Sequence, residues 1–514
     1  MIKRAAAILL PLFSLRTGDD LGRGEIGGLR PLAQWMLQMG QRALQLLPLS
    51  ESAAGEYSPY SALSVFSIDP LYISVGGLAG IPAADLQRAQ AQTAGRRRIA
   101  RAQLRALKLP LLAAAFAHFR AHGGAEEREG FARFAAENRH WLDDYALFRA
   151  LKDRFEWADW KQWPDGLRDL HHDAIAAARR ELAEPIAMYS YWQYLAWRQW
   201  TQMRAEFAAA NLSLIGDLAF LPACDSADVW ANQQLFMLDR LVGAPPDAFS
   251  AKGQRWGLPM PNWPRMRGDD LRWWRERARR AVQMFDMLRI DHVVGFYRTY
   301  SFGPNPDDAG EFFPQEEEAQ REQGEAFFRM LKQEAGEDAI IGEDLGTVPP
   351  WVRVSLAKLG VLGLKVFRWE KKDWRAPRER FIPPAQYPEL SVAVTGTHDT
   401  ETLAQWWREA APAERAQLAE AMRFPKNADL SAPELTMDLL DAILESLYAA
   451  PSRLVMAPVQ DLFGWEERIN VPGSIDDHNW TYRLPQTIEQ LIADPQIARR
   501  AEKLRALAQR TGRF

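Results

Sequence analysis

Cysteine is almost absent from this chain of 514 residues, which contains only Cys224. One cysteine cannot form an internal disulfide, so the class of small secreted domains held by disulfides is excluded and a reducing compartment is expected. We therefore predict a cytoplasmic location. No paired histidine motif lies near Cys224, and we interpret it as a small buried hydrophobic residue.

Long apolar runs are also missing. No segment approaches the roughly 18 consecutive apolar residues that a membrane-spanning helix requires, so no membrane partner is expected. Residues 1–13 imitate the basic and apolar parts of a signal peptide, but Pro11 interrupts them and no convincing small-residue cleavage site follows. A buried first strand is the better prediction for this segment.

Neither sign of charge is in large excess. The chain has 63 Lys and Arg against 67 Asp and Glu, which gives a formal net charge of -4. Such a balance provides no general attraction for polyanions, and nucleic acid is not expected as a partner. Internal repeats and low-complexity tails are absent from the sequence as well, and no linker marks a second independent domain.

Short apolar runs, separated by helical stretches or long insertions, recur along the chain. Alternation of buried strands and helices favours parallel pairing with the helices outside, and eight such units close a barrel. We therefore predict an α/β fold, a (β/α)8 TIM barrel with long active-site loops. The eight predicted strands are residues 8–13, 43–47, 212–215, 288–290, 339–341, 362–367, 392–395 and 454–459.

A long region between the second and third predicted strands differs in composition from the rest. Residues 83–211 are rich in Ala, Arg, Gln, Glu and Leu, which predicts a set of amphipathic helices, with a turn at Gly123 and Gly124. We expect a catalytic barrel formed by residues 1–82 and 212–514, and a mainly helical inserted subdomain formed by residues 83–211.

A second insertion, residues 243–264, is rich in glycine and proline and contains Trp256 and Trp263. This composition predicts a connection without regular structure. So long a connection in a compact enzyme is usually a lid or a binding loop, because binding residues are often carried by loops on a rigid scaffold.

Three segments place an acid at the end of an apolar run: Arg-Ile-Asp-His at 289–292, Gly-Glu-Asp-Leu-Gly at 342–346 and Thr-His-Asp at 397–399. Carboxylates at the ends of successive strands meet at one end of a parallel barrel. Retaining glycoside chemistry needs such a set, with a carboxylate nucleophile and a protonated carboxylic acid roughly 5–5.5 Å apart. A lone acid at a strand end is commonly a cap or an ion-pair partner, but three in this order favour catalysis.

The neighbours of these acids suggest their roles. Asp291 suits the nucleophile, because Arg289 would point to the same face of the strand and help to keep the carboxylate ionised. Glu343 suits the general acid/base, because burial and neighbouring carboxylates would raise its pKa. Asp399, beside His398, can stabilise positive charge developing on the sugar.

Two neighbours of the acids are interpreted as structural. Asp344 follows Glu343 directly and should point to the opposite side, where a structural hydrogen bond is expected. His292 follows Asp291 and is expected to be a packed, hydrogen-bonded residue at the strand end, since no partner histidine stands at a spacing suited to a metal.

The chain resembles the 4-α-glucanotransferase family, also called amylomaltases or disproportionating enzymes, which are relatives of the α-amylase superfamily. The resemblance extends over the barrel, and Gly-Gln-Arg-Trp-Gly at 253–257 is its most specific motif. The other matching segments, besides the three acidic ones, are 9–12 (Leu-Leu-Pro-Leu), 46–49 (Leu-Leu-Pro-Leu), 57–64 (Tyr-Ser-Pro-Tyr-Ser-Ala-Leu-Ser), 215–218 (Ile-Gly-Asp-Leu), 468–473 (Arg-Ile-Asn-Val-Pro-Gly) and 479–480 (Asn-Trp).

The resemblance implies roles for particular residues. The catalytic residues are then Asp291 as nucleophile, Glu343 as general acid/base and Asp399 as the acid that stabilises the transition state. The residues implied to contact the sugar at the cleavage site or to line the glucan groove are Arg289, His398, Asp217, Tyr60, Ser58, Asp247, Gln254, Trp256 and Asn470. The rings of Tyr60 and Trp256 are also chemically suited to stack on the apolar faces of glucose.

The implied activity is transfer of an α-1,4-glucan segment to the 4-hydroxyl of an acceptor glucose or glucan, with α-1,4-glucans and maltooligosaccharides as partners. No metal, nucleotide or organic cofactor is implied. An α-1,4-glucan hydrolase of the same superfamily would use the same acids with water as acceptor. A non-catalytic glucan-binding protein is a further alternative, against which the complete set of acids speaks.

Overall fold

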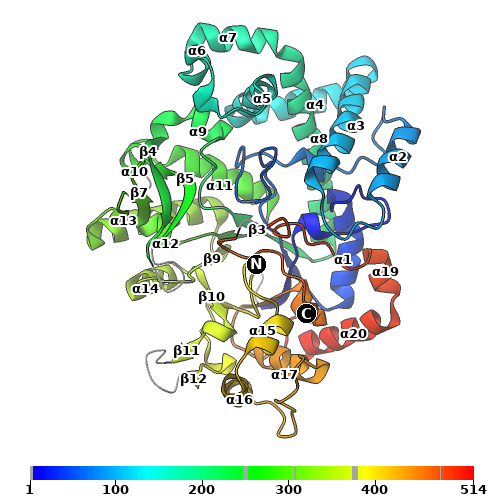
Figure 1. The fold of residues 1–514 in the computed structure, drawn as a ribbon, viewed down its shortest axis with the longest axis vertical. Helices are drawn as coiled ribbons and strands as arrows, with labels where there is room; N and C mark the ends of the chain where they lie inside the picture. The colour runs from blue at the N-terminus through cyan, green and yellow to red at the C-terminus, as the bar shows by residue number, and fades with distance from the viewer. Residues whose placement is uncertain (1–3, 247–252, 306–307, 373–379, 475) are drawn as a thin grey trace.

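The structure is a computed structural model that describes residues 4–246, 253–305, 308–372, 380–474 and 476–514. Within these residues, eight parallel strands close a barrel, which confirms the predicted fold class (Figure 1). Every predicted strand overlaps one of them. In chain order they are β1 (Ala5–Leu9), β2 (Ala43–Gln45), β3 (Ser213–Leu218), β6 (Met287–Ile290), β9 (Ile340–Gly342), β10 (Leu362–Val366), β13 (Ser391–Val394) and β14 (Leu454–Pro458).

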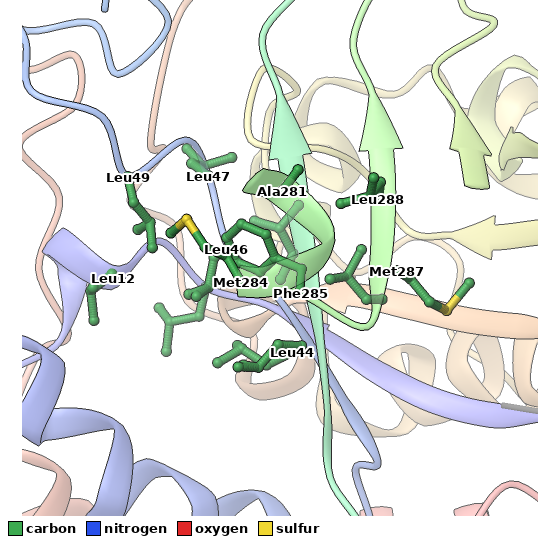
Figure 2. Packing of buried hydrophobic residues seen from close by; sticks show 14 of the residues in the cluster. Leu12, Leu44, Leu46, Leu47, Leu49, Ala281, Met284, Phe285, Met287 and Leu288 are labelled. Carbon is green, nitrogen blue, oxygen red and sulfur yellow. The ribbon is translucent and has the colours of Figure 1, made fainter. Parts of the chain in front are cut away.

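Burial on both faces explains why these strands are continuous apolar runs rather than alternating ones. All residues of β1, β13 and β14 are buried. Figure 2 shows Met284 and Phe285, at the end of helix α11 (Arg272–Met284), among leucines of the barrel wall such as Leu44 and Leu288. Gly216 in β3 makes room for this packing, because a Cβ atom there would lie 2.2 Å from the ring of Phe285.

Seven α-helices lie between β2 and β3 in the chain and are found together in the upper part of Figure 1. Gly123 and Gly124 separate two of them, as predicted. Trp163 packs edge-on against Trp230 at a centroid distance of 5.7 Å, which joins the insertion to a short helix beyond β3. The helices are α2 (Ala83–Thr93), α3 (Arg101–His122), α4 (Ala125–Glu137), α5 (Arg139–Arg154), α6 (Asp165–Arg168), α7 (His172–Glu181) and α8 (Ala183–Ala209). The division into a barrel and a separate subdomain stays a prediction.

The expectation that 243–264 lacks regular structure is wrong for the described residues. β4 (Phe236–Ala244) and β5 (Gln254–Pro261) pair antiparallel, and β7 (Thr299–Phe302) and β8 (Glu311–Phe313) complete a four-stranded sheet in the order β5-β4-β7-β8. Proline normally argues against a strand because it cannot donate to the ladder. Pro259 and Pro261 are compatible with β5 because it is an edge strand. A residue of an edge strand whose backbone nitrogen is directed away from the neighbouring strand does not need an N–H donor.

The other helices cover the outside of the barrel or lie in its loops. No helix among the described residues is long and apolar enough to cross a membrane. The remaining α-helices are α1 (Leu29–Gln38), α9 (Ala227–Ala231), α10 (Trp263–Gly268), α12 (Val294–Tyr297), α13 (Glu317–Ala335), α14 (Pro350–Lys358), α15 (Leu403–Glu409), α16 (Pro412–Ala421), α17 (Met437–Tyr448), α18 (Val459–Phe463), α19 (Ile488–Ala493) and α20 (Pro495–Arg510). Two short strands, β11 (Lys371–Lys372) and β12 (Arg380–Phe381), form a separate antiparallel pair.

Candidate active site

The register of the barrel brings the first two acids together. Ile290, the last residue of β6, pairs with Gly342, the last residue of β9. Asp291 and Glu343 follow these two partners and therefore leave neighbouring strands side by side, at the C-terminal end of the barrel. Active sites of such barrels are formed at this end, where the strands open into their loops.

Arg289 links two of the carboxylates. It is the register partner of Asp217 on β3, and its Nη1 donates to Asp217 Oδ1 at 2.6 Å and to Asp291 Oδ1 at 3.0 Å. Burial raises the pKa of Asp217, and the charge of Asp291 adds to this, while Arg289 opposes both. The arginine thus compensates a buried negative charge that would otherwise be costly.

Glu343 has the pKa expected of a general acid. Burial and the nearby charge of Asp291 together raise this pKa to about 8, against the attraction of Arg289. The carboxyl group accepts backbone N–H bonds from His292 at 2.9 Å and Leu345 at 3.1 Å, which act in the opposite direction. The carboxyl group is therefore mostly protonated at neutral pH and can donate a proton.

Asp399, in contrast to Glu343, is held as an ionised carboxylate. Although burial alone would raise its pKa, His398 and Asn470 lower it to about 2. His398 Nε2 lies 3.1 Å from Oδ2, and Asn470 Nδ2 donates to Oδ1 at 2.6 Å. Carboxyl groups whose environments push their pKa values apart mark separate acid and carboxylate roles in one site.

Tyr60 joins both sides of the site. Its hydroxyl donates to Asp217 Oδ2 at 2.9 Å and lies 3.0 Å from His398 Nε2, and its ring stacks on the His398 ring at 5.4 Å. Ser58 supports this arrangement, since its hydroxyl accepts the backbone N–H of Tyr60 at 3.2 Å. The structure therefore brings Tyr60, Asp217 and His398 together, as expected for one site.

The β4–β5 hairpin reaches the same end of the barrel. The ring of Trp256 lies edge-on to that of His292 at 4.8 Å, next to Asp291. Trp256 Nε1 donates to Gln254 Oε1 at 3.2 Å, and Gln254 is exposed. Asp247, which the resemblance also assigns to the groove, lies outside the described residues.

The residues interpreted as structural are placed largely as predicted. Asp344 points away from the acids and accepts the backbone N–H of Leu364 at 2.9 Å. Burial lowers the pKa of His292 to about 4, and its ring packs on Phe220 at 5.4 Å. Cys224 is half-buried rather than buried as predicted, and it lies in the irregular connection between β3 and α9.

Two residues near the acids were not assigned from the sequence. Arg468 Nη2 donates to the backbone oxygen of Asp399 at 2.8 Å. The ring centroid of Trp480 lies 5.8 Å from the ring centroids of both Tyr60 and His398. Both residues belong to segments that match the family, 468–473 and 479–480, and this match was the signal by which they could have been found. The segments alone do not show that the connection after α18 returns to the acids.

A closed parallel barrel with these carboxyl groups at its C-terminal end is suited to an enzyme that acts on glycosidic bonds. The comparison with known families agrees, because the sequence model of the 4-alpha-glucanotransferase family matches residues 10–488. The chain belongs to this family, which confirms the resemblance and makes it a glycosyl-transferring enzyme.

Similar proteins cover nearly the whole chain. The 4-alpha-glucanotransferase of Thermus thermophilus is 32% identical over 526 aligned positions and covers 100% of both chains. That of Chlamydia pneumoniae is 32% identical over 509 positions, which cover 97% of this chain and 94% of the relative. The amylomaltase of Streptococcus agalactiae, solved in complex with acarbose, superposes with a TM-score of 0.86 at 26% identity, covering 99% of this chain and 100% of that one.

Proposed function

We propose that this protein transfers a segment of an α-1,4-glucan to the 4-hydroxyl group of an acceptor by a retaining double displacement. The observation that carries the proposal is the position of Asp291 and Glu343 directly after the paired residues Ile290 and Gly342 of adjacent strands, with the pKa of Glu343 raised to about 8. Acarbose bound to the amylomaltase of Streptococcus agalactiae supports α-1,4-glucans and maltooligosaccharides as the substrates.

In the first step, the carboxylate of Asp291 attacks the anomeric carbon while the protonated Glu343 gives its proton to the leaving oxygen, and a covalent glycosyl-enzyme forms. In the second step, Glu343, now ionised, takes the proton of the acceptor 4-hydroxyl, whose oxygen attacks the anomeric carbon and releases Asp291. The ionised Asp399 stabilises the positive charge that develops on the sugar in both steps.

The other residues are proposed to bind the glucan. Arg289, Asp217, Tyr60 and His398 contact the sugar at the cleavage site in this proposal. Their mutual bonds fix their positions before the substrate arrives, which favours catalysis because little ordering remains to be done. The residues proposed to line the groove farther out are Ser58, Asp247, Gln254, Trp256 and Asn470.

Transfer requires that water be kept from the glycosyl-enzyme. The β4–β5 hairpin is our candidate for this exclusion, because Trp256 brings an apolar ring to the neighbourhood of Asp291. We further propose a cytoplasmic location, which rests only on the near absence of cysteine.

The test is the fate of reducing ends during incubation with maltotriose. Transfer changes the chain lengths but conserves the number of reducing ends, whereas the hydrolase alternative increases that number steadily. Asp291→Ala is expected to abolish both reactions. Undiminished activity of this variant, or a separation of the Asp291 and Glu343 carboxyl groups near the roughly 6.5–9.5 Å of inverting enzymes in an oligosaccharide complex, would exclude the mechanism.

A further inference from the structure

The connection after α18 returns to the active site and contacts Asp399 twice. Arg468 Nη2 donates to the backbone oxygen of Asp399 at 2.8 Å, and Asn470 Nδ2 donates to its side-chain Oδ1 at 2.6 Å. An ionised carboxylate gains most from such a bond, because hydrogen bonds to charged groups are the stronger ones. The position of Asn470 therefore affects the acid directly.

Asn479 fixes the backbone that carries Asn470. Its Oδ1 accepts the N–H of Val471 at 2.9 Å, and its Nδ2 donates to the Val471 oxygen at 3.3 Å and to both the backbone oxygen and Oγ of Ser474 at 3.1 Å. Both ends of the amide are thus engaged, and the residue is 7% exposed. Neither aspartate nor alanine can reproduce this set of bonds.

The next residue shows how tightly the loop is held. Trp480 has a φ of +61°, a left-handed conformation that is unfavourable for a bulky side chain. Its N–H donates to the oxygen of Ile469 at 2.8 Å, and its ring packs against Tyr60 and His398. Such strain persists only where the surroundings determine the conformation strongly, and it is frequent at functional sites.

We infer that Asn479 is a positioning residue for Asp399, acting through Asn470. It touches neither the acid nor the sugar ring that the proposed mechanism places there. It ties the two ends of the loop together across Val471, so that the amide of Asn470 stays directed at the carboxylate. The inference rests on the proposed role of Asp399 in stabilising the transition state.

A double-mutant cycle between Asn479 and Asn470 tests this inference. We expect Asn479→Ala and Asn470→Ala each to lower kcat for maltotriose roughly 10- to 100-fold with KM changed much less, since small misplacements at a reacting centre have effects of this size. The double variant should lose little more than the more affected single variant, because both changes remove the same bond to Asp399.

Asn138 provides a matched control. It is 8% exposed, and its amide also bonds at both ends, donating to the oxygen of Phe134 at 2.8 Å and accepting from Trp141 Nε1 at 3.1 Å, but it lies in the helical insertion. Asn138→Ala should lower the melting temperature while leaving kcat within about twofold, and its effect should be independent of Asn470→Ala.

The outcomes separate the inference from the function on which it rests. The positioning role is refuted if the wild-type protein transfers glucan but the fold-losses in kcat of Asn479→Ala and Asn470→Ala multiply in the double variant. It is also refuted if Asn479→Ala keeps the wild-type kcat. If the wild-type protein does not transfer glucan, the proposed function is refuted, and this role with it. Should Asn479→Ala fail to fold, Asn479→Asp takes its place in the cycle, since it keeps the acceptor for Val471 but loses the donors.

Discussion

Replacement of Glu343 by glutamine tests the assignment of the general acid/base most directly. Glutamine has nearly the same shape and keeps one oxygen that can accept a backbone N–H from His292 or Leu345. It cannot release or take up a proton in the working pH range. The change therefore separates proton transfer from the packing at the end of β9.

The structure provides the size of the effect. With a pKa of about 8, Glu343 is about 90% protonated at pH 7, and kcat/KM should fall about tenfold for each pH unit well above 8. General acid–base catalysis typically contributes ~10²–10⁴ in rate. Glu343→Gln should therefore reduce kcat/KM for maltotriose by that factor, about 3–5 kcal/mol of transition-state stabilisation, and the fall above pH 8 should disappear.

The assay compares two donors that differ in their leaving group. Maltotriose requires a proton on its leaving oxygen, whereas fluoride leaves α-maltosyl fluoride without one. In Glu343→Gln, formation of the glycosyl-enzyme from the fluoride should stay within about tenfold of wild type, because only the protonated leaving group depends on the acid. Added azide should restore turnover, since this acceptor needs no general base.

Two results would refute the reasoning. The first is an equal loss with both donors, which would make Glu343 a structural or binding residue. The second is a fall in activity above pH 8 that persists in the variant, which would assign that titration to another group. Asp291→Asn serves as the control, because it should prevent glycosyl-enzyme formation from either donor.

Further predictions concern buried charge and packing. Arg289→Leu leaves the two carboxylates that it bonds without their cation and should lower the free energy of unfolding by ~3–5 kcal/mol in urea titrations. Any remaining activity should extend to higher pH, because Arg289 lowers the pKa of Glu343, and a shift to lower pH would contradict this. Gly216→Ala should destabilise by about 1–3 kcal/mol through its clash with Phe285. In the control variant Gly268→Ala the added methyl group meets open space, and the free energy of unfolding should stay within about 0.5 kcal/mol of wild type. Equal urea midpoints for the two glycine variants would instead show that the barrel relaxes around the methyl group added at Gly216.

The barrel and the order of its acids could be predicted because they depend on local sequence. A strand buried on both faces is a short apolar run, and the acid after it is placed by the parallel register. The end of β3 was harder to predict from the sequence. The strand continues to Leu218, beyond the apolar residues at 212–215, so that Asp217 lies inside the barrel wall. Its charge is tolerated there because Arg289 is its register partner, a contact between residues 72 positions apart.

Two parts of the site could not be derived from local patterns. The β4–β5 hairpin contains residues that usually interrupt strands, and only its edge position makes them compatible with pairing. The bond between Asn470 and Asp399 joins segments 71 residues apart. Nothing in either segment alone specifies the other, and only the resemblance placed both near the substrate. The catalytic roles themselves stay predictions until the variants are measured.

The prolines of β5 affect how the protein behaves towards other chains. An exposed strand edge normally offers a row of free N–H and C=O groups, to which an extended peptide or a second copy can add as a further strand. Pro259 and Pro261 supply no N–H donors and are buried, and in the exposed part of the strand Gly257 interrupts the extended backbone with a left-handed φ of +69°. The edge beside the proposed glucan groove is therefore a poor template for β-sheet extension, which lowers the risk of aggregation at this surface.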